Sequence, residues 1–522
     1  MQEVQSPPRL PSNVSIKVTA VETPAETPAT LLGWLPIVWT RVLFAGPMAD
    51  VPPLCWRSFL ILFVLSGALL YPCMSFHLFE PDEGRYAQIP REMLERGDWI
   101  VPTLQQQPYL DKPPLFYWLV ALSFSIFGFH DWAARLVPAL AMHGAVMMTY
   151  LLGRRIVGER SAFWGALLLI VSPIFLGVGR LLVLDGLLTF WVTASLLTIC
   201  LAQDGEEAHI GWWFASAVSC GLGVLTKGPI AMVLVLVPLL MHRMLAPSAR
   251  VTWLAWLGFF AVIAAINLPW YGAVCWQRPE FVRYFLWQHN IERFVEPFDH
   301  VRPVWFYVPI VLFGLLPTLF FGWPLWRYLT SLDADAADAR CPAVGYLLLA
   351  GAWCVFFFSL AGSKLPTYIL PAFPPLCLAL GCFAARTGWC ESRWFIGSVA
   401  LCWLALAFSH YYAIPVYAGQ KSPVSDMQMI EKMCGDPKVP IVCFPRNVDS
   451  VAFYVGRSDF RTFRSKEIDN LVVTLHQAPR TVILFGHRNS PETLARHLPA
   501  HLRMVERRPL GLCEMAVIER VE

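Results

Sequence analysis

Long apolar runs separated by short polar connections occupy most of the first four hundred residues. A run of about 20 apolar residues can cross a membrane, and lipid offers the backbone no hydrogen-bond partner, so such runs must be helices. The pattern predicts an all-α polytopic membrane protein with about eleven to thirteen spans. The expected spans are Leu54–Phe76, Trp132–Leu152, Ala162–Val178, Leu181–Leu201, Gly211–Leu225, Pro229–Met241, Trp253–Tyr271, Val304–Trp326, Val344–Ala361, Tyr368–Ala385 and Phe395–Tyr412.

Composition agrees with a membrane protein and excludes other classes. The chain has 522 residues, of which 56% are hydrophobic and 15% charged, against about 45–50% and 25% in an ordinary soluble domain. The net charge of +3 gives no reason to expect a nucleic-acid partner. The 14 cysteines form no CxxC pair, which argues against a zinc or disulfide framework.

The polar segments divide the chain into three parts. Residues 1–50 are rich in Pro, Thr, Ser and Glu and are expected to form a disordered cytoplasmic tail. Residues 51–414 are expected to form the transmembrane domain, with Lys and Arg of alternate connections on the cytoplasmic side. The two longest connections, 77–131 and 272–303, then lie outside, on the same face as residues 415–522.

The last hundred residues have a different pattern, and their alternation predicts a small α/β soluble domain. The apolar segment 114–127 is too short to span comfortably and is expected to be an interfacial helix. In the C-terminal domain we expect strands at Val439–Phe444, Val451–Val455, Leu471–Leu475 and Val482–Phe485, and helices at Ser425–Cys434 and Pro491–Leu498.

Three carboxylates open the first outer loop, where Glu80, Asp82 and Glu83 fall within four positions. A solvated acidic loop would explain the composition alone. However, these carboxylates directly follow a membrane helix, and aromatic and small residues surround them, which favours the wall of a pocket. A further carboxylate, Asp185, lies near the start of an apolar run. Burying it costs about 2.5–3.5 kcal/mol on insertion scales, so it needs a purpose or a partner, and Arg180 is a candidate partner.

Three cations lie on the outer face, although positive residues normally lie inside. Lys112 precedes a Pro-Pro pair that fixes the backbone, while Arg293 and Lys364 lie in later outer connections. Snorkelling or topology would explain any one of them. Together, cations suited to a phosphate and carboxylates suited to positioning or general-base catalysis favour chemistry on a membrane-anchored phosphate. No P-loop or GxGxxG cradle is present, so nucleotide use is not supported.

These motifs resemble a family, the GT-C type polyprenyl-phosphate-dependent glycosyltransferases. The chain is most similar to the bacterial lipid A aminoarabinose transferases, which are relatives of the protein O-mannosyltransferases. The matching residues run in family order from about 80 to 371: Glu80–Ala87, Arg91–Met93, Gly97–Trp99, Asp111–Leu115, Ala134–Leu136, Asp185, Asn290–Phe294 and Ser363–Pro371.

The resemblance implies a sugar donor on undecaprenyl phosphate and a reaction on the periplasmic side of the inner membrane, with lipid A as acceptor. It implies that Asp82 is the main catalytic carboxylate and that Asp185 is a second acidic position, with Glu83 of the same acidic motif as a further candidate catalytic residue. The implied donor-phosphate ligands are Lys112, Arg293 and Tyr368, with Lys364 as a further candidate.

Relatives also use a Glu before this Lys, with a His of the second outer loop, in a metal site. Here Asp111 replaces that Glu, which keeps the charge and shortens the arm, and His289 is the candidate histidine. Two candidates do not make a site, so a divalent metal stays open as a cofactor.

Several alternatives remain. The acceptor could be a protein, a core oligosaccharide or another glycan, and the sugar a hexosamine, mannose or a uronic acid. A transporter or flippase is a more distant reading, because transporters usually place charges near the midplane and contain inverted repeats. In this chain the charges gather at one face and no repeat is found.

Overall fold

The structure, a computed structural model, describes residues 54–246, 249–292, 300–331, 340–341, 343–424, 426–486 and 490–521. For residues 286 and 289–291 the structure describes the backbone but not the side chains. The predicted tail, residues 1–50, lies outside the described residues.

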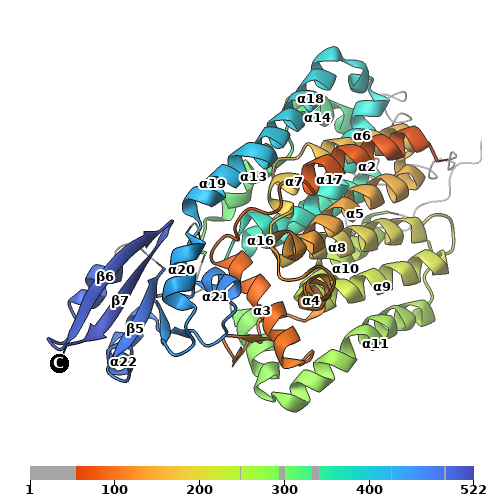
Figure 1. Cartoon of the computed structure of the whole chain (residues 1–522). Helices are drawn as coiled ribbons and strands as arrows, with labels where there is room; N and C mark the ends of the chain where they lie inside the picture. Colours follow the sequence, from red (N-terminus) through yellow and green to blue (C-terminus); the bar gives the residue numbers. More distant parts are fainter. Residues whose placement is uncertain are drawn as a thin grey trace, which may run out of the picture.

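Helices account for most of the described chain up to residue 421, and each of the predicted apolar spans falls on helical structure (Figure 1). The helices in chain order are α2 (Trp56–Leu70), α3 (Asp82–Arg96), α4 (Leu115–Phe127), α5 (Asp131–Val157), α6 (Glu159–Ile170), α7 (Phe175–Gly179), α8 (Leu184–Ala202), α9 (Ile210–Lys227), α10 (Ile230–Leu245), α11 (Trp253–Gln277), η1 (Val282–Glu292), η2 (Val304–Phe306), α13 (Tyr307–Gly314), η3 (Thr318–Phe321), α14 (Gly322–Thr330), α16 (Val344–Leu360), η4 (Pro366–Ala372), α17 (Phe373–Arg386), η5 (Trp389–Glu391), α18 (Arg393–Phe408), η6 (Ser409–Ala413) and α19 (Ile414–Lys421).

Five helical stretches of the described chain are long and apolar enough to cross a membrane. They are Asp131–Val157, Leu184–Ala202, Trp253–Gln277, Pro366–Arg386 and Arg393–Lys421. A sixth results if the pair Val304–Gly314 and Thr318–Thr330, bent by 105°, is counted as one span. The remaining predicted spans lie on shorter or less apolar helices, so their crossing stays a prediction.

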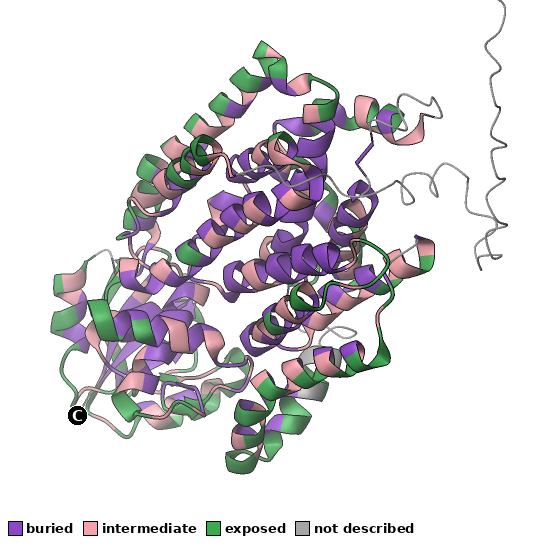
Figure 2. Cartoon of the chain, turned by 90° about the vertical axis from the view of Figure 1, so that its right-hand side faces the viewer, coloured by how far each residue is buried: buried purple, intermediate pink, exposed green. Residues whose placement is uncertain are grey.

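The helices pack into a bundle whose middle is buried and whose outer helices are exposed (Figure 2). In the most apolar part of α8, 89% of the residues are buried, whereas in the most apolar part of Arg393–Lys421 only 17% are buried. Exposed large side chains on this outer stretch include Trp394 and Leu401. An apolar helix with so little protein cover is expected to face lipid.

A five-stranded sheet follows the bundle, in the order β4-β3-β5-β7-β6. The first three strands in this order are parallel to one another. The strand β7 is antiparallel to both of its neighbours, β5 and β6. We call Met427–Arg520 the C-terminal α/β region. Its elements are α20 (Met427–Cys434), β3 (Ile441–Phe444), α21 (Asp449–Val455), β4 (Arg461–Thr462), η7 (Ser465–Glu467), α22 (Ile468–Leu475), β5 (Arg480–Phe485), α23 (Ser490–Ala495), β6 (Leu502–Leu510) and β7 (Cys513–Arg520).

Two of the four strands predicted here were wrong. Val451–Val455 lies in α21 and Leu471–Leu475 lies in α22, so both are helical. Short segments of mostly apolar residues fit either a strand or one face of a short helix, and periodicity cannot separate the two. The other two strand predictions, at β3 and β5, are confirmed, as are helices overlapping both predicted helical segments.

The C-terminal α/β region is attached to the bundle through α21, which packs against α3 (Figure 1). Glycine at position 84 permits this approach, because a Cβ there would lie 2.4 Å from the backbone nitrogen of Ser450. The helix that begins with the acidic motif is therefore covered directly by the last hundred residues.

Candidate active site

The acidic motif forms the first turn of α3, where Asp82 and Glu83 are the first two residues. Carboxylates are favoured at a helix N-terminus because the backbone N–H groups there carry partial positive charge. The two side chains have different surroundings. Asp82 is 45% exposed, and among the described residues it forms an ion pair with Arg85, at 3.6 Å. Its carboxylate is thus available to an incoming molecule.

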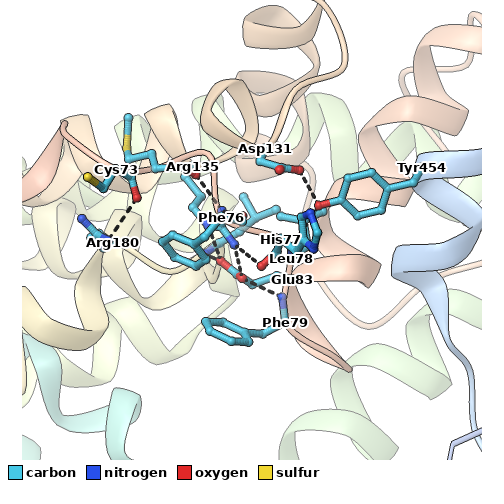
Figure 3. A network of polar contacts seen from close by, with 12 residues as sticks. Cys73, Phe76, His77, Leu78, Phe79, Glu83, Asp131, Arg135, Arg180 and Tyr454 are labelled. Carbon is cyan, nitrogen blue, oxygen red and sulfur yellow. Dashed lines mark hydrogen bonds and ion pairs between the residues drawn. The ribbon is translucent and has the colours of Figure 1, made fainter. Parts of the chain in front are cut away.

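Glu83 is enclosed and fully engaged within the protein (Figure 3). Arg135, which is completely buried, donates to both of its carboxylate oxygens at 2.6 and 2.8 Å. The backbone N–H groups of Phe79 and Leu182 donate to the same carboxylate at 2.9 and 2.8 Å. Glu83 therefore ties α3 to α5 and to the segment before α8, which is a positioning role. A direct catalytic role for Glu83 stays a prediction.

Asp185 lies in the first turn of α8 and pairs with a lysine that the sequence analysis did not select. The Nζ of Lys227, at the end of α9, donates to its Oδ1 at 2.5 Å, with side-chain exposures of 13% and 10%. The same Nζ lies 4.3 Å from the ring centroid of Tyr368 in η4. Three elements thus bring an anion, a cation and a phenol together.

The predicted partner of Asp185 was wrong. Arg180 is buried and donates to backbone carbonyls, those of Leu69, Pro72, Cys73 and His410, at 3.2–3.4 Å. Part of this arrangement is visible in Figure 3, where Arg180 reaches Cys73. Arg180 therefore holds the end of α2 and η6 in place and leaves Asp185 to Lys227.

The pKa of the Tyr86 phenol responds to three of the predicted carboxylates. Burial, and then the charge of Asp82, raises the pKa of the Tyr86 phenol well above its ordinary value, and the charges of Asp185 and Asp111 act in the same direction. Arg85 opposes this effect. The charges of three predicted carboxylates therefore all act on the same phenol, which they keep neutral.

The remaining predicted cations are not equivalent. Lys364 is 3% exposed, and its Nζ donates to the carbonyl oxygens of Arg302 and Ala361, so it supports the connection before η4. Lys112 is half-buried next to the start of α4. Arg293 lies outside the described residues.

Of the two candidate metal ligands, the structure describes the side chain of Asp111. Asp111 accepts a hydrogen bond from the Tyr284 hydroxyl at 2.5 Å. His289 lies on η1, but its side chain is outside the description. Within the described ranges, no group of three His, Cys, Asp or Glu side chains could hold a metal ion. The described donor set thus does not fit a metal centre, and no step below depends on one.

Glu80 joins the site to the C-terminal α/β region. Its Oε1 accepts a hydrogen bond from the backbone N–H of Ser450 at 2.5 Å. Burial, and then the neighbouring Asp449 carboxyl, raises the pKa of Glu80 to about 7. Because Glu80 Oε2 and Asp449 Oδ2 are enclosed without a hydrogen-bond partner, this pair retains a proton at pH values where an exposed carboxyl is ionised.

Known proteins resemble the chain in sequence and in fold. Residues 111–270 match the family model of dolichyl-phosphate-mannose-protein mannosyltransferase. An undecaprenyl phosphate-alpha-4-amino-4-deoxy-L-arabinose arabinosyl transferase of Edwardsiella ictaluri is 35% identical over 340 residues, covering 63% of this chain and 59% of the relative. A protein of the same name from Yersinia pestis is 34% identical over 328 residues, covering 60% and 57%. The chain thus spans about three fifths of the length of these curated relatives.

A solved structure extends the resemblance to most of the fold. The crystal structure of ArnT from Cupriavidus metallidurans bound to undecaprenyl phosphate superposes with a TM-score of 0.71 at 19% identity. The match covers 89% of this chain and 98% of ArnT. The resemblance expected from the motifs is thereby confirmed: the chain is a membrane protein with the ArnT-like GT-C fold, and its residues 111–270 match the family model of dolichyl-phosphate-mannose-protein mannosyltransferase.

Proposed function

We propose that this protein transfers a sugar, 4-amino-4-deoxy-L-arabinose or a similar one, from undecaprenyl phosphate to lipid A. The reaction takes place at the periplasmic face of the bacterial inner membrane. In this proposal residues 51–414 form the glycosyltransferase domain and residues 415–522 a periplasmic domain, while residues 1–50 form a cytoplasmic tail.

One observation carries the proposal: Asp185, Lys227 and Tyr368 meet where three apolar helical elements begin or end. The phosphate of a polyprenyl carrier lies at that depth, because its chain is buried in lipid and its charge is not. A lysine and a phenol are suitable donors to phosphate oxygens. The curated relatives are named for an undecaprenyl phosphate-linked aminoarabinose, and the superposed ArnT is bound to undecaprenyl phosphate.

The proposed reaction is an inverting displacement. An oxygen of the acceptor attacks the anomeric carbon as the bond from that carbon to the lipid phosphate oxygen breaks. The carrier phosphate leaves with the electron pair, stabilised by Lys227 and Tyr368, together with Lys112 and Arg293. A phosphate acceptor is already ionised near neutral pH, so Asp82 orients the reactants. A hydroxyl acceptor must lose its proton, and Asp82 then acts as general base.

A second acceptor class has its own support. The family model that matches residues 111–270 is described as a protein mannosyltransferase, which favours a Ser or Thr hydroxyl as acceptor. The donor chemistry is the same in both cases. The two candidates differ in what carries the sugar afterwards.

Mass spectrometry of lipid A tests the first candidate. Cells that make the undecaprenyl-linked donor are compared with and without this protein, and we expect lipid A to gain the mass of an aminopentose or hexosamine only when the protein is present. Unchanged lipid A, with the protein in the membrane and the donor detected, would reject lipid A as acceptor. Glycopeptide analysis of the same membranes then tests the protein acceptor.

Replacement of Lys227 by Met is expected to raise the apparent KM for the donor by roughly tenfold, since a charge-assisted contact to phosphate is lost. It also leaves Asp185 without its cation, so thermal stability in detergent should fall. The double variant Asp185→Asn/Lys227→Met should regain stability but not donor affinity. Lys421→Met, at the end of α19, is the matched control, and an unchanged donor KM in Lys227→Met would contradict the role.

A further inference from the structure

A large polar cleft separates the C-terminal α/β region from the bundle. Its volume is about 1520 Å³, larger than the roughly 300–1,000 Å³ of most small-molecule pockets. One wall is the hairpin of β1 (Thr103–Leu104) and β2 (Gln107–Pro108) with the segment that follows it. The second wall is the start of η1, and the third is formed by the segments around β3 and β4.

The lining of the cleft includes residues of the candidate active site. Arg85, Tyr109 and Asp111 line it there, and Arg85 is the residue that forms the ion pair with Asp82. A molecule that fills the cleft can therefore place one end next to Asp82. The described lining of the cleft does not include the cluster of Asp185, Lys227 and Tyr368, where we propose that the donor phosphate binds.

Cations exceed carboxylates in the lining. The carboxylates are engaged: Asp459 pairs with Arg457 at 2.6 Å, Asp111 accepts from Tyr284, and Glu280 lies 4.0 Å from Arg278. The outer cations, in contrast, form no ion pair with a carboxylate of the described residues. These cations are Arg283 on the bundle side and Lys438, Arg461 and Arg464 on the C-terminal side.

We propose that this cleft binds the acceptor and that its outer cations, chiefly Arg461 and Arg464, hold an anionic group of the acceptor, a phosphate of a phosphorylated saccharide lipid. This inference rests on the proposed glycosyl transfer and specifies the acceptor class. Two arginines present planar donor forks suited to phosphate oxygens. In this arrangement the phosphate held by the two arginines is not the group that receives the sugar.

A simpler explanation for Arg461 is that it protects β4, the edge strand of the sheet, from pairing with another chain. That explanation does not account for Arg283, which comes from a different part of the chain and lines the same cleft. Convergence of cations from two regions on one cleft favours a ligand.

The test is a transfer assay with the full-length protein in lipid nanodiscs, with lipid A carrying two phosphates as acceptor. Arg461→Gln/Arg464→Gln is expected to raise the apparent KM for this acceptor by about tenfold. The donor KM should not change. The matched control is Arg496→Gln/Arg503→Gln, which removes two exposed charges of the same region outside the cleft.

A second acceptor with a single phosphate makes the result specific. For the wild-type protein, the KM for the single-phosphate acceptor should exceed the KM for lipid A with two phosphates by a similar factor. For the single-phosphate acceptor, Arg461→Gln/Arg464→Gln should have the same KM as the wild type, because the contact that the variant loses is already absent. An unchanged acceptor KM, or a rise in the donor KM instead, would overturn the assignment of the cleft while leaving the transferase proposal intact. Absence of any transfer by the wild-type protein would instead reject the proposed function.

Discussion

Asp82→Asn is expected to lower the rate of sugar transfer by about 10² to 10⁴, the usual contribution of a positioned catalytic carboxylate. Asn keeps the size of the side chain and removes its charge. The side chain is 45% exposed and its ion pair with Arg85 is long, so the fold does not depend on it. We therefore expect the purified variant to unfold at the same temperature as the wild type and to bind the donor.

A matched control lies on the same helix. Glu95 forms an ion pair with Arg91 at 2.7 Å and is 40% exposed, so Glu95→Gln also removes one carboxylate from an arginine pair on α3. Its transfer rate should match the wild type. The measurement is the initial rate at saturating donor and acceptor, and a rate for Asp82→Asn above a tenth of the wild type would exclude a catalytic role.

Glu83→Gln is expected to have the opposite profile, a loss of stability rather than a specific loss of chemistry. It leaves the guanidinium of Arg135 buried without an anion, and breaking a buried pair in this way costs about 3–5 kcal/mol. Arg135→Met should be equally damaging, since it also leaves the carbonyls of Met74 and Phe76 without their donor. Thermal unfolding in detergent, followed by size-exclusion chromatography, measures the effect.

The exposed pair of Arg160 and Glu391 provides the comparison. Its atoms are also close, at 2.7 Å, but the side chains are 54% and 71% exposed, and such pairs contribute about 0–1 kcal/mol. Glu391→Gln should therefore unfold within a degree or two of the wild type. If Glu83→Gln did the same, the Arg135 network would not be the support that its geometry indicates.

Much of the helical part was predictable because the apolar runs are long and lipid permits only one regular structure for them. The C-terminal α/β region was harder. The strand β6 contains Arg503, Glu506, Arg507 and Arg508 and is largely exposed, so hydrophobic alternation did not reveal it. The helices α21 and α22 were taken for strands since their apolar runs are too short to establish a period.

The candidate site was predictable in position but not in the roles of its residues. Asp82 and Glu83 are neighbours in sequence, and only the buried Arg135, 52 positions away, separates the exposed carboxylate from the engaged one. Lys227 was missed because a lysine at the end of an apolar helix resembles one that snorkels to the headgroups. Its following Gly-Pro, a rigid helix stop, was the available signal.

The contact between α3 and α21 has a consequence for how this protein can be divided. Gln88 donates to the carbonyl oxygen of Arg457 at 3.0 Å, and Gln105 donates to the Asp449 carboxylate at 3.3 Å. With the Glu80 bond to Ser450, these contacts lie before, on and after α3, the helix that carries Asp82. The last hundred residues are therefore not an interchangeable module. A chimaera that replaces them with a relative's counterpart must exchange residues 80–105 at the same time to keep the two surfaces complementary.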